Sequence, residues 1–500
     1  MLKPASLFTD GAVLCRRKEI RIFGTVSEGR TVTVRLFSRE GTLLADACAQ
    51  ENEGRFTVSL PPQEAQTGCR LLMDAGNDHA EAADISVGDI FLAGGQSNME
   101  LGLRNADEGP ELVRTFDDPQ LRFFNVPKQA VSGPGQRKAV DETRWQTVRP
   151  GQGGFNSAVA SFFARKLRER NPDIPVGIIG CYWGGTSITC WMEEDVLRET
   201  AEGTRYLEEY AALTAGKSME TWQAEEAQFK NTFGTWCRAV DAYRQDHPRA
   251  PWEDIEAACG IAPWNPPAGP GSPYRPAGLA VTMVREIIPV TLTAVLFYQG
   301  EEDTWKTVRY EELLIQLIRA WRRAFRDETL PFLFVQLPMW ADRSTGNDCR
   351  WAMLRKAQAT VRDVVPGTGM VCLLDQGEFG NIHPTAKRPV GERLAELAGA
   401  MLYGGGEISP RATGLQISDD TLVVHLSAPV RILGKDASLL EIAEARGPWV
   451  PALAELRGSD LLLRAEGIKH PARARYAWTD YSDQVSLFGK NGLPLEPFDL

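Results

Sequence analysis

A serine stands directly after a buried apolar run near residue 97. Residues 90–93 (Ile-Phe-Leu-Ala) predict a short buried strand, and Gly94 and Gly95 end it before Ser97. Glycines at such a point let the backbone turn sharply and approach a ligand closely. We therefore interpret Ser97 as a nucleophile held at a strand end, which needs a base and a site for an oxyanion.

Histidine is the usual base for such a serine, because its pKa lies near neutrality. The chain has five histidines, and only His383 falls where strand and helix patterns alternate. The others lie in β-like ends or in an insertion: His79, His247, His425 and His470. His383 stands between the last predicted strand and the last predicted helix, which is the sheet edge expected for Ser97. We therefore predict that His383 is the base.

Two further strand ends offer hydrogen-bond donors. Gly184 follows a predicted strand at 176–179, and Gln299 follows one at 294–298. The N–H of Gly184, the Gln299 amide and the N–H of Ser97 would together form an oxyanion hole.

The elements that position these groups alternate along the chain. Strands are expected at 90–93, 176–179, 294–298, 332–337 and 370–374, and helices at 157–170, 309–326, 351–363 and 389–402. Strands alternating with helices predict a parallel sheet covered on both faces.

The two ends of the chain have a different pattern. Residues 1–86 show period-two alternation and predict a small β-sandwich or jelly roll, followed by an α/β catalytic domain over 87–404. A helical and Pro/Gly-rich insertion interrupts that domain at about 193–270, where it could cover the active-site face. Residues 405–500 return to β-like runs, and we expect them to pack with the N-terminal domain.

Composition excludes several classes of protein. The 500 residues carry a net charge of −11, which argues against nucleic acid or an anionic membrane as a partner. We see neither a signal-peptide pattern at the start nor an apolar run long enough to span a membrane. Nine scattered cysteines without a CxxC pair indicate reduced thiols in a cytoplasmic protein and argue against a zinc site. Acyl transfer by a serine and a histidine requires no metal and no cofactor, so we expect neither.

Taken together, these motifs resemble the sialate O-acetylesterase family, whose catalytic domain is of the SGNH-hydrolase type. The resemblance rests on many short blocks in order: Gly95-Gln96-Ser97-Asn98-Met99, Trp183-Gly184-Gly185-Thr186, Tyr298-Gln299-Gly300-Glu301, 331–337, 354–358, Ile382-His383-Pro384 with Lys387, 390–395 and 475–478.

The resemblance implies a three-layer α/β/α, flavodoxin-like SGNH domain with β-rich flanks. It implies that Ser97 is the nucleophile and His383 the base, with Gly184 and Gln299 in the oxyanion hole. The implied reaction removes acetyl groups from O-acetylated sialic acid through an acetyl-serine.

One departure concerns the acid that orients the histidine. SGNH enzymes commonly carry Asp three residues before it, where this chain has Gly380. A backbone carbonyl, Glu301 or Asp375 could take that part.

Substrate contacts are expected from Gln96 and Asn98 beside the nucleophile, from Trp183 by stacking and from Arg355 by charge. Two other functions stay open: an esterase acting on acetylated xylan or another glycan, and a non-catalytic carbohydrate-binding protein on the same fold. A metal-dependent phosphodiesterase is disfavoured because the chain has few histidines to bind a metal.

Overall fold

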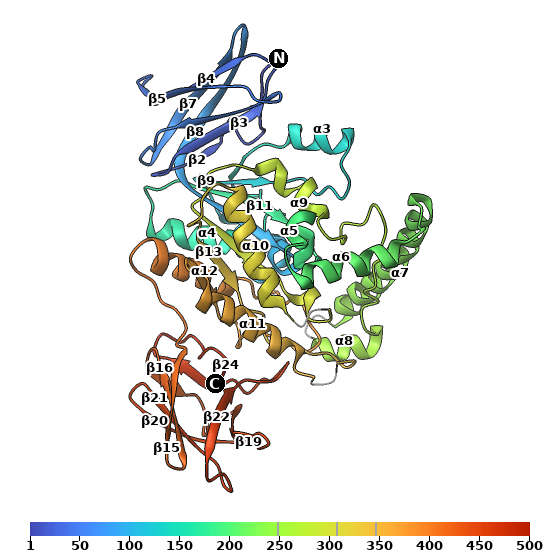
Figure 1. Ribbon diagram of the computed structural model, residues 1–500, viewed down its shortest axis with the longest axis vertical. Helices are drawn as coiled ribbons and strands as arrows, with labels where there is room; N and C mark the ends of the chain where they lie inside the picture. The colour runs from blue at the N-terminus through green and yellow to red at the C-terminus, as the bar shows by residue number, and fades with distance from the viewer. Residues whose placement is uncertain (248–249, 307–308, 346–347) are drawn as a thin grey trace.

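The computed structural model describes residues 1–247, 250–306, 309–345 and 348–500. The chain forms three regions along the long axis of the molecule (Figure 1). N-terminal strands lie at one end, C-terminal strands lie at the other, and a mixed α/β region lies between them.

One long strand, β8 (Asp78–Gly95), connects the first two regions. Its first half pairs antiparallel with β7 (Gln66–Ala75), and its second half pairs parallel with β11 (Val176–Tyr182) and β12 (Ala294–Tyr298). The predicted run 90–93 is the buried second half of this strand. Ser97 is therefore attached to the middle of a continuous sheet.

The central strands follow the order β10-β9-β11-β8-β12-β13-β14. The remaining bounds are β9 (Asp118–Asn125), β10 (Gln146–Val148), β13 (Phe332–Val335) and β14 (Thr368–Val371). All pairs from β9 to β14 are parallel, and β10 is antiparallel at the edge. The predicted α/β class is confirmed, whereas β9 lies in a polar stretch where no strand was expected.

Four long helices cover the sheet: α4 (Ala158–Arg170), α10 (Tyr310–Ala324), α11 (Arg350–Val364) and α12 (Arg388–Leu402). Phe91 of β8 packs on Phe163 of α4, with ring centroids 4.8 Å apart. Gly94 lies three residues along the strand and so on the opposite face, where a Cβ would be 3.3 Å from Trp321 of α10. Helices therefore contact both faces, and the SGNH assignment of this arrangement stays a prediction.

The N-terminal strands share one core with the central sheet. They form a sheet of β1 (Lys3–Pro4), β3 (Ile20–Thr25) and β6 (Arg55–Leu60), and they extend β8 with β2 (Val13–Cys15), β4 (Thr31–Phe37) and β5 (Leu43–Gln50). Alternate side chains of β4 are buried, which matches the period-two pattern of the sequence.

The predicted insertion is helical. It comprises α5 (Glu194–Leu197), α6 (Ala201–Thr214), α7 (Met219–Asp246) and α8 (Trp252–Cys259), with residues 248–249 outside the described chain. The Tyr206 hydroxyl of α6 donates to Asp303 at 2.9 Å, directly after β12. A Cβ on Gly380 would lie 2.3 Å from the Trp252 ring of α8. The insertion thus packs on loops at the carboxyl edge of the sheet.

The C-terminal strands form their own sheets, which corrects the expectation that they pack with the N-terminal domain. The larger ones contain β15 (Ala412–Ser418), β16 (Thr421–Leu426), β20 (Leu453–Arg457) and β21 (Asp460–Arg464), and β18 (Leu440–Glu444), β19 (Val450–Pro451), β22 (Pro471–Tyr476) and β24 (Phe498–Asp499). Their apolar side chains share a second core with Met339, Cys372 and Leu374, from loops after β13 and β14. That core lies beyond the edge strand β14, far from the N-terminal strands (Figure 1).

The cysteine thiols and the helix hydropathy were also part of the expectations. All nine cysteines are free, and burial raises the thiol pKa of seven of them above its usual value: Cys15, Cys69, Cys181, Cys190, Cys237, Cys349 and Cys372. Within the described ranges, none of the helices combines the length and the hydropathy needed to cross a membrane.

Candidate active site

Ser97 and His383 meet at the carboxyl edge of the central sheet. Ser97 begins the short helix α1 (Ser97–Glu100), directly after β8, and His383 lies in the loop between β14 and α12. His383 Nε2 is 2.8 Å from Ser97 Oγ, which is hydrogen-bond distance. Two residues separated by 286 positions therefore form the predicted nucleophile–base geometry.

Asn98 holds the loop that carries His383. Its Nδ2 donates to the Ile382 carbonyl at 2.9 Å and to Glu301 Oε1 at 2.5 Å. Its Oδ1 accepts from Lys387 Nζ at the start of α12. Asn98 is 1% exposed, so these bonds are shielded from water. The prediction that Asn98 contacts substrate is therefore wrong, because its polar atoms are used within the protein.

Of the two buried charged residues Lys387 and Glu301, Lys387 acts on the base. Burial lowers the pKa of Lys387 to about 8 and raises that of Glu301, although the Asn98 bond and Lys387 partly offset the rise. Two causes lower the pKa of His383 from 6.5 to about 4. The larger is the loss of water around the ring where the protein packs on it, and the smaller is the positive charge of Lys387. His383 is thus neutral at neutral pH, the state a general base requires.

Among the residues that the structure describes, none donates to or accepts from Nδ1 of His383. Asp375 instead forms a bidentate ion pair with Arg393, at 2.7 and 2.6 Å. The prediction that Asp375 orients His383 is therefore wrong. Glu301 is connected to the histidine loop through Asn98, which donates to Glu301 and to the Ile382 carbonyl. Gly380 stands where SGNH enzymes commonly carry the orienting Asp. Glu256 of α8 lies beside it, and a Cβ added to Gly380 would be 3.2 Å from Glu256 Cδ.

Gly184 lies against the nucleophile, as predicted, but its N–H is already bonded. A Cβ on Gly184 would be 3.2 Å from Ser97 Cβ. The Gly184 N–H donates to Glu100 Oε2 at 2.6 Å, and Glu100 is in turn paired with Lys128. An acyl oxygen would have to displace this carboxylate to reach the donor. As the first residue of α1, Ser97 has an N–H with no acceptor inside the helix.

Gln299 is not available as an oxyanion donor, which contradicts its predicted role. Its Nε2 donates to Asp303, to the Thr186 carbonyl at 3.1 Å and to Gln96 at 3.2 Å. An amide has two N–H groups, so three acceptors leave neither free. Gln96 is 2% exposed and also accepts from the Gly300 N–H at 3.3 Å, so its predicted substrate contact is wrong for the same reason.

The two remaining predicted substrate contacts differ. Trp183 is half-buried beside Gly184, with Lys128 Nζ 5.4 Å from its ring centroid, and its stacking role stays a prediction. Arg355 is fully buried, and it donates to the backbone carbonyls of Ala477 and Thr479. Its predicted charge contact with substrate is wrong, because Arg355 joins α11 to the C-terminal region.

The roles of three residues beside the site were not predicted from the sequence. Glu100 lies one helical turn after Ser97, which a reading of α1 as a helix could have indicated. Lys387 donates to Asn98 because it lies directly before α12, and the sequence does not define that helix start to one residue. Trp264 comes from the Pro/Gly-rich loop, whose path the sequence does not define.

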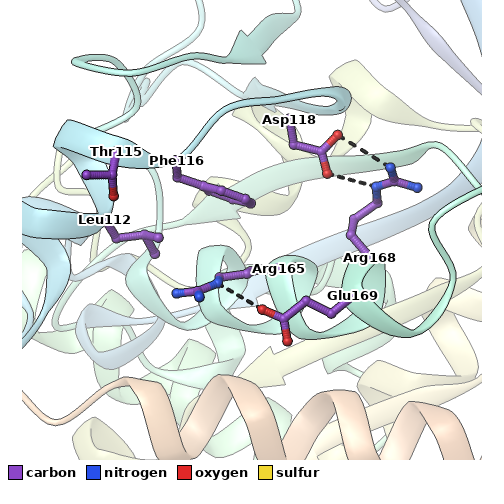
Figure 2. A pocket seen from close by; sticks show the side chains of 7 residues that line it. All are labelled: Leu112, Thr115, Phe116, Asp118, Arg165, Arg168 and Glu169. Atoms are coloured by element: carbon purple, nitrogen blue, oxygen red, sulfur yellow. Dashed lines mark hydrogen bonds and ion pairs between the residues drawn. The ribbon is translucent and has the colours of Figure 1, made fainter.

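A separate hollow lies away from this edge. Figure 2 shows it between the start of β9, at Asp118, and the second half of α4. Its charged side chains pair with one another, Arg168 with Asp118 at 2.8 Å and Arg165 with Glu169 at 3.0 Å. Since Asp118 opens a strand parallel to β8, the hollow is at the amino end of the sheet and is no candidate for the chemistry at Ser97.

The parallel sheet with a Ser–His pair at its carboxyl edge defines an α/β protein with the geometry of a serine hydrolase. A family model for "carbohydrate esterase, sialic acid-specific acetylesterase" matches residues 257–399. Sialate O-acetylesterase of Rattus norvegicus is 24% identical over 95% of this chain and 90% of its own length, and that of Homo sapiens is 24% identical over 95% and 88%. A crystal structure of a carbohydrate acetylesterase from Xanthomonas citri is 27% identical, covers 100% of this chain and 99% of its own, and has a TM-score of 0.75. The resemblance to the sialate O-acetylesterase family is therefore confirmed.

Proposed function

We propose that this protein is a carbohydrate O-acetylesterase that uses Ser97 as its nucleophile. The single observation that carries the proposal is the 2.8 Å contact between His383 Nε2 and Ser97 Oγ. The relatives named sialate O-acetylesterase and carbohydrate acetylesterase support an acetyl ester of a sugar as the substrate.

In the proposed first half-reaction, His383 takes the proton of Ser97 while Oγ attacks the acetyl carbonyl carbon. The tetrahedral oxyanion is stabilised by the Ser97 N–H and by the Gly184 N–H, once Glu100 has left it. The C–O bond to the sugar then breaks, and His383 gives its proton to the sugar oxygen. The sugar leaves and the acetyl group stays on Ser97.

Water completes the proposed cycle. His383 takes a proton from the water, whose oxygen attacks the acetyl-serine. When this second tetrahedral species collapses, the proton returns to Ser97 and acetate leaves. With its pKa lowered, His383 is at neutral pH in the neutral form, which accepts a proton.

O-Acetylated sialic acid is the first substrate candidate, since it is the substrate named for the mammalian relatives. An acetylated xylan or another glycan is the second. It is favoured by the full-length likeness to the carbohydrate acetylesterase and by the burial of Arg355, which cannot receive a sialic acid carboxylate.

Acetate release from 9-O-acetylated N-acetylneuraminic acid and from acetylated xylo-oligosaccharide, measured with wild type and Ser97→Ala, tests the proposal. We expect release from one of the two sugars, reduced at least about 10³-fold in the variant. Near-wild-type turnover by Ser97→Ala would refute the serine mechanism. Absence of hydrolysis of these sugars and of a p-nitrophenyl ester would favour the non-catalytic carbohydrate-binding alternative.

A further inference from the structure

The Pro/Gly-rich loop of the insertion brings Trp264 to the turn beside the nucleophile. A Cβ on Gly185, where φ is +72°, would lie 2.1 Å from Trp264 Cζ2, so the indole packs directly on the Gly185 backbone. The preceding residue, Gly184, is the one whose Cβ would lie 3.2 Å from Ser97 Cβ. Ser97, Gly184, Gly185 and Trp264 are therefore in continuous contact.

The Trp264 ring is held in one orientation. Its Nε1 donates to Glu302 Oε2 at 3.2 Å. Phe229, Phe233 and Tyr274 surround it in edge-to-face contacts, with ring centroids 5.7, 5.5 and 5.7 Å away. Such contacts fix an aromatic ring without the entropy cost of ordering it when a ligand binds.

Despite these contacts, Trp264 keeps 39% of its surface exposed. Three other aromatic side chains near this edge each have a cation over the ring: Arg104 over Phe155 at 3.8 Å, Lys128 over Trp183 at 5.4 Å, and Arg350 over Trp305 at 5.8 Å. Within the described part of the chain, no cation covers Trp264. What sets Trp264 apart is therefore its place: a fixed aromatic face, with no cation over it among the described residues, lies beside the turn that carries Gly184.

We propose that Trp264 forms a sugar subsite, on which a pyranose ring of the acetylated substrate stacks through its C–H face. The apolar C–H face of a pyranose matches the flat indole, while its hydroxyls stay in water or reach polar groups at the rim. The subsite rests on the proposed function, because it gives Trp264 the task of binding the sugar while Ser97 and His383 act on the ester. Trp264 is thus a specificity residue supplied by the insertion.

The test compares Trp264→Ala, Trp264→Phe and, as a matched control, Trp449→Ala in the C-terminal region, where Trp449 packs on Arg473 and Arg475. Each variant is assayed on p-nitrophenyl acetate, on 9-O-acetylated N-acetylneuraminic acid and on acetylated xylo-oligosaccharide. We expect Trp264→Ala to raise the KM for an acetylated sugar about tenfold and to lower kcat/KM far more on that sugar than on p-nitrophenyl acetate, which has no pyranose ring to stack. Trp264→Phe should recover part of the affinity, and the control should match wild type.

The two sugar substrates show which pyranose ring stacks on Trp264, because the KM of Trp264→Ala should rise for that sugar. An unchanged KM for both sugars would overturn the subsite while leaving the esterase intact. Equal loss on p-nitrophenyl acetate and sugar, with a lower Tm, would also overturn it, because Trp264 would then only hold the loop. If wild type cleaves no ester, calorimetric titration with the same acetylated sugars still decides: weaker binding by Trp264→Ala supports the subsite, and equal binding refutes it.

Discussion

The two sides of the Ser97–His383 pair are held in different ways. On the base side, Asn98 connects the nucleophile helix α1 to Glu301, to the Ile382 carbonyl and to Lys387, and all its side-chain polar atoms are bonded and buried. On the oxyanion side, the Gly184 N–H is bonded to Glu100, a side chain that is 31% exposed and paired with Lys128.

The base side is therefore the fixed half of the site, and the oxyanion side is the half that can change. A buried, fully bonded network costs much to rearrange, because each freed polar atom would lose its partner away from water. A partly exposed carboxylate can return to water at a smaller cost. We therefore expect the base side to keep its geometry through catalysis and the oxyanion side to exchange Glu100 for the acyl oxygen.

The largest effect is expected from Asn98→Ala, which removes the link between α1 and the histidine loop. His383 should lose its alignment with Ser97, and kcat on p-nitrophenyl acetate should fall about 10²-fold with little change in KM. Asn231→Ala, on the exposed face of α7, is the matched control. A fall explained entirely by a lower Tm would mean that Asn98 only stabilises the fold.

A smaller effect is expected from Lys387→Gln, which keeps a donor for Asn98 but removes the positive charge. Lys387 is one cause of the low pKa of His383, after burial, so the variant should raise that pKa. Because the base is active when neutral, the acid limb of kcat/KM should move from near pH 4 to higher pH, by about one unit or less. An unmoved acid limb would show that burial alone sets the pKa of the base.

The smallest effect is expected from Glu100→Gln on the oxyanion side. A neutral amide oxygen accepts the Gly184 N–H more weakly than a carboxylate does. The donor should be released more readily, so kcat/KM should rise about two- to fivefold. Glu111→Gln, an exposed ion-pair residue of α2 (Gly109–Thr115), is the control. A fall of tenfold or more would instead assign Glu100 a productive role in the site.

Much of the fold could be predicted from local patterns. Helix α4 begins after Ser157, which caps it by accepting from the Ala160 N–H at 3.1 Å, and β12 has the predicted bounds. Apolar periodicity and capping residues are local signals, so they survive without tertiary information. β9 was missed because its first half is polar and lies near the sheet edge.

The site was predictable where it depended on strand ends. Parallel strands place their carboxyl ends at one edge, so Ser97 and His383 could be paired from the order of elements alone. Gln299 also lies at that edge, yet its amide is used by Asp303 and Thr186. Sequence position gives the edge on which a side chain lies but not the partner it finds there.

The α/β elements, the nucleophile and base candidates and the family resemblance could all be predicted from the sequence, because each follows from residue types in local order. The folded chain was needed to show that Asn98 links the base loop to Lys387, that Glu100 accepts from the Gly184 N–H, that Trp264 lies on Gly185 and that the C-terminal strands pack beyond β14. These contacts join residues from separate elements, and hydrogen-bond geometry and close packing select among many partners that composition alone leaves equivalent.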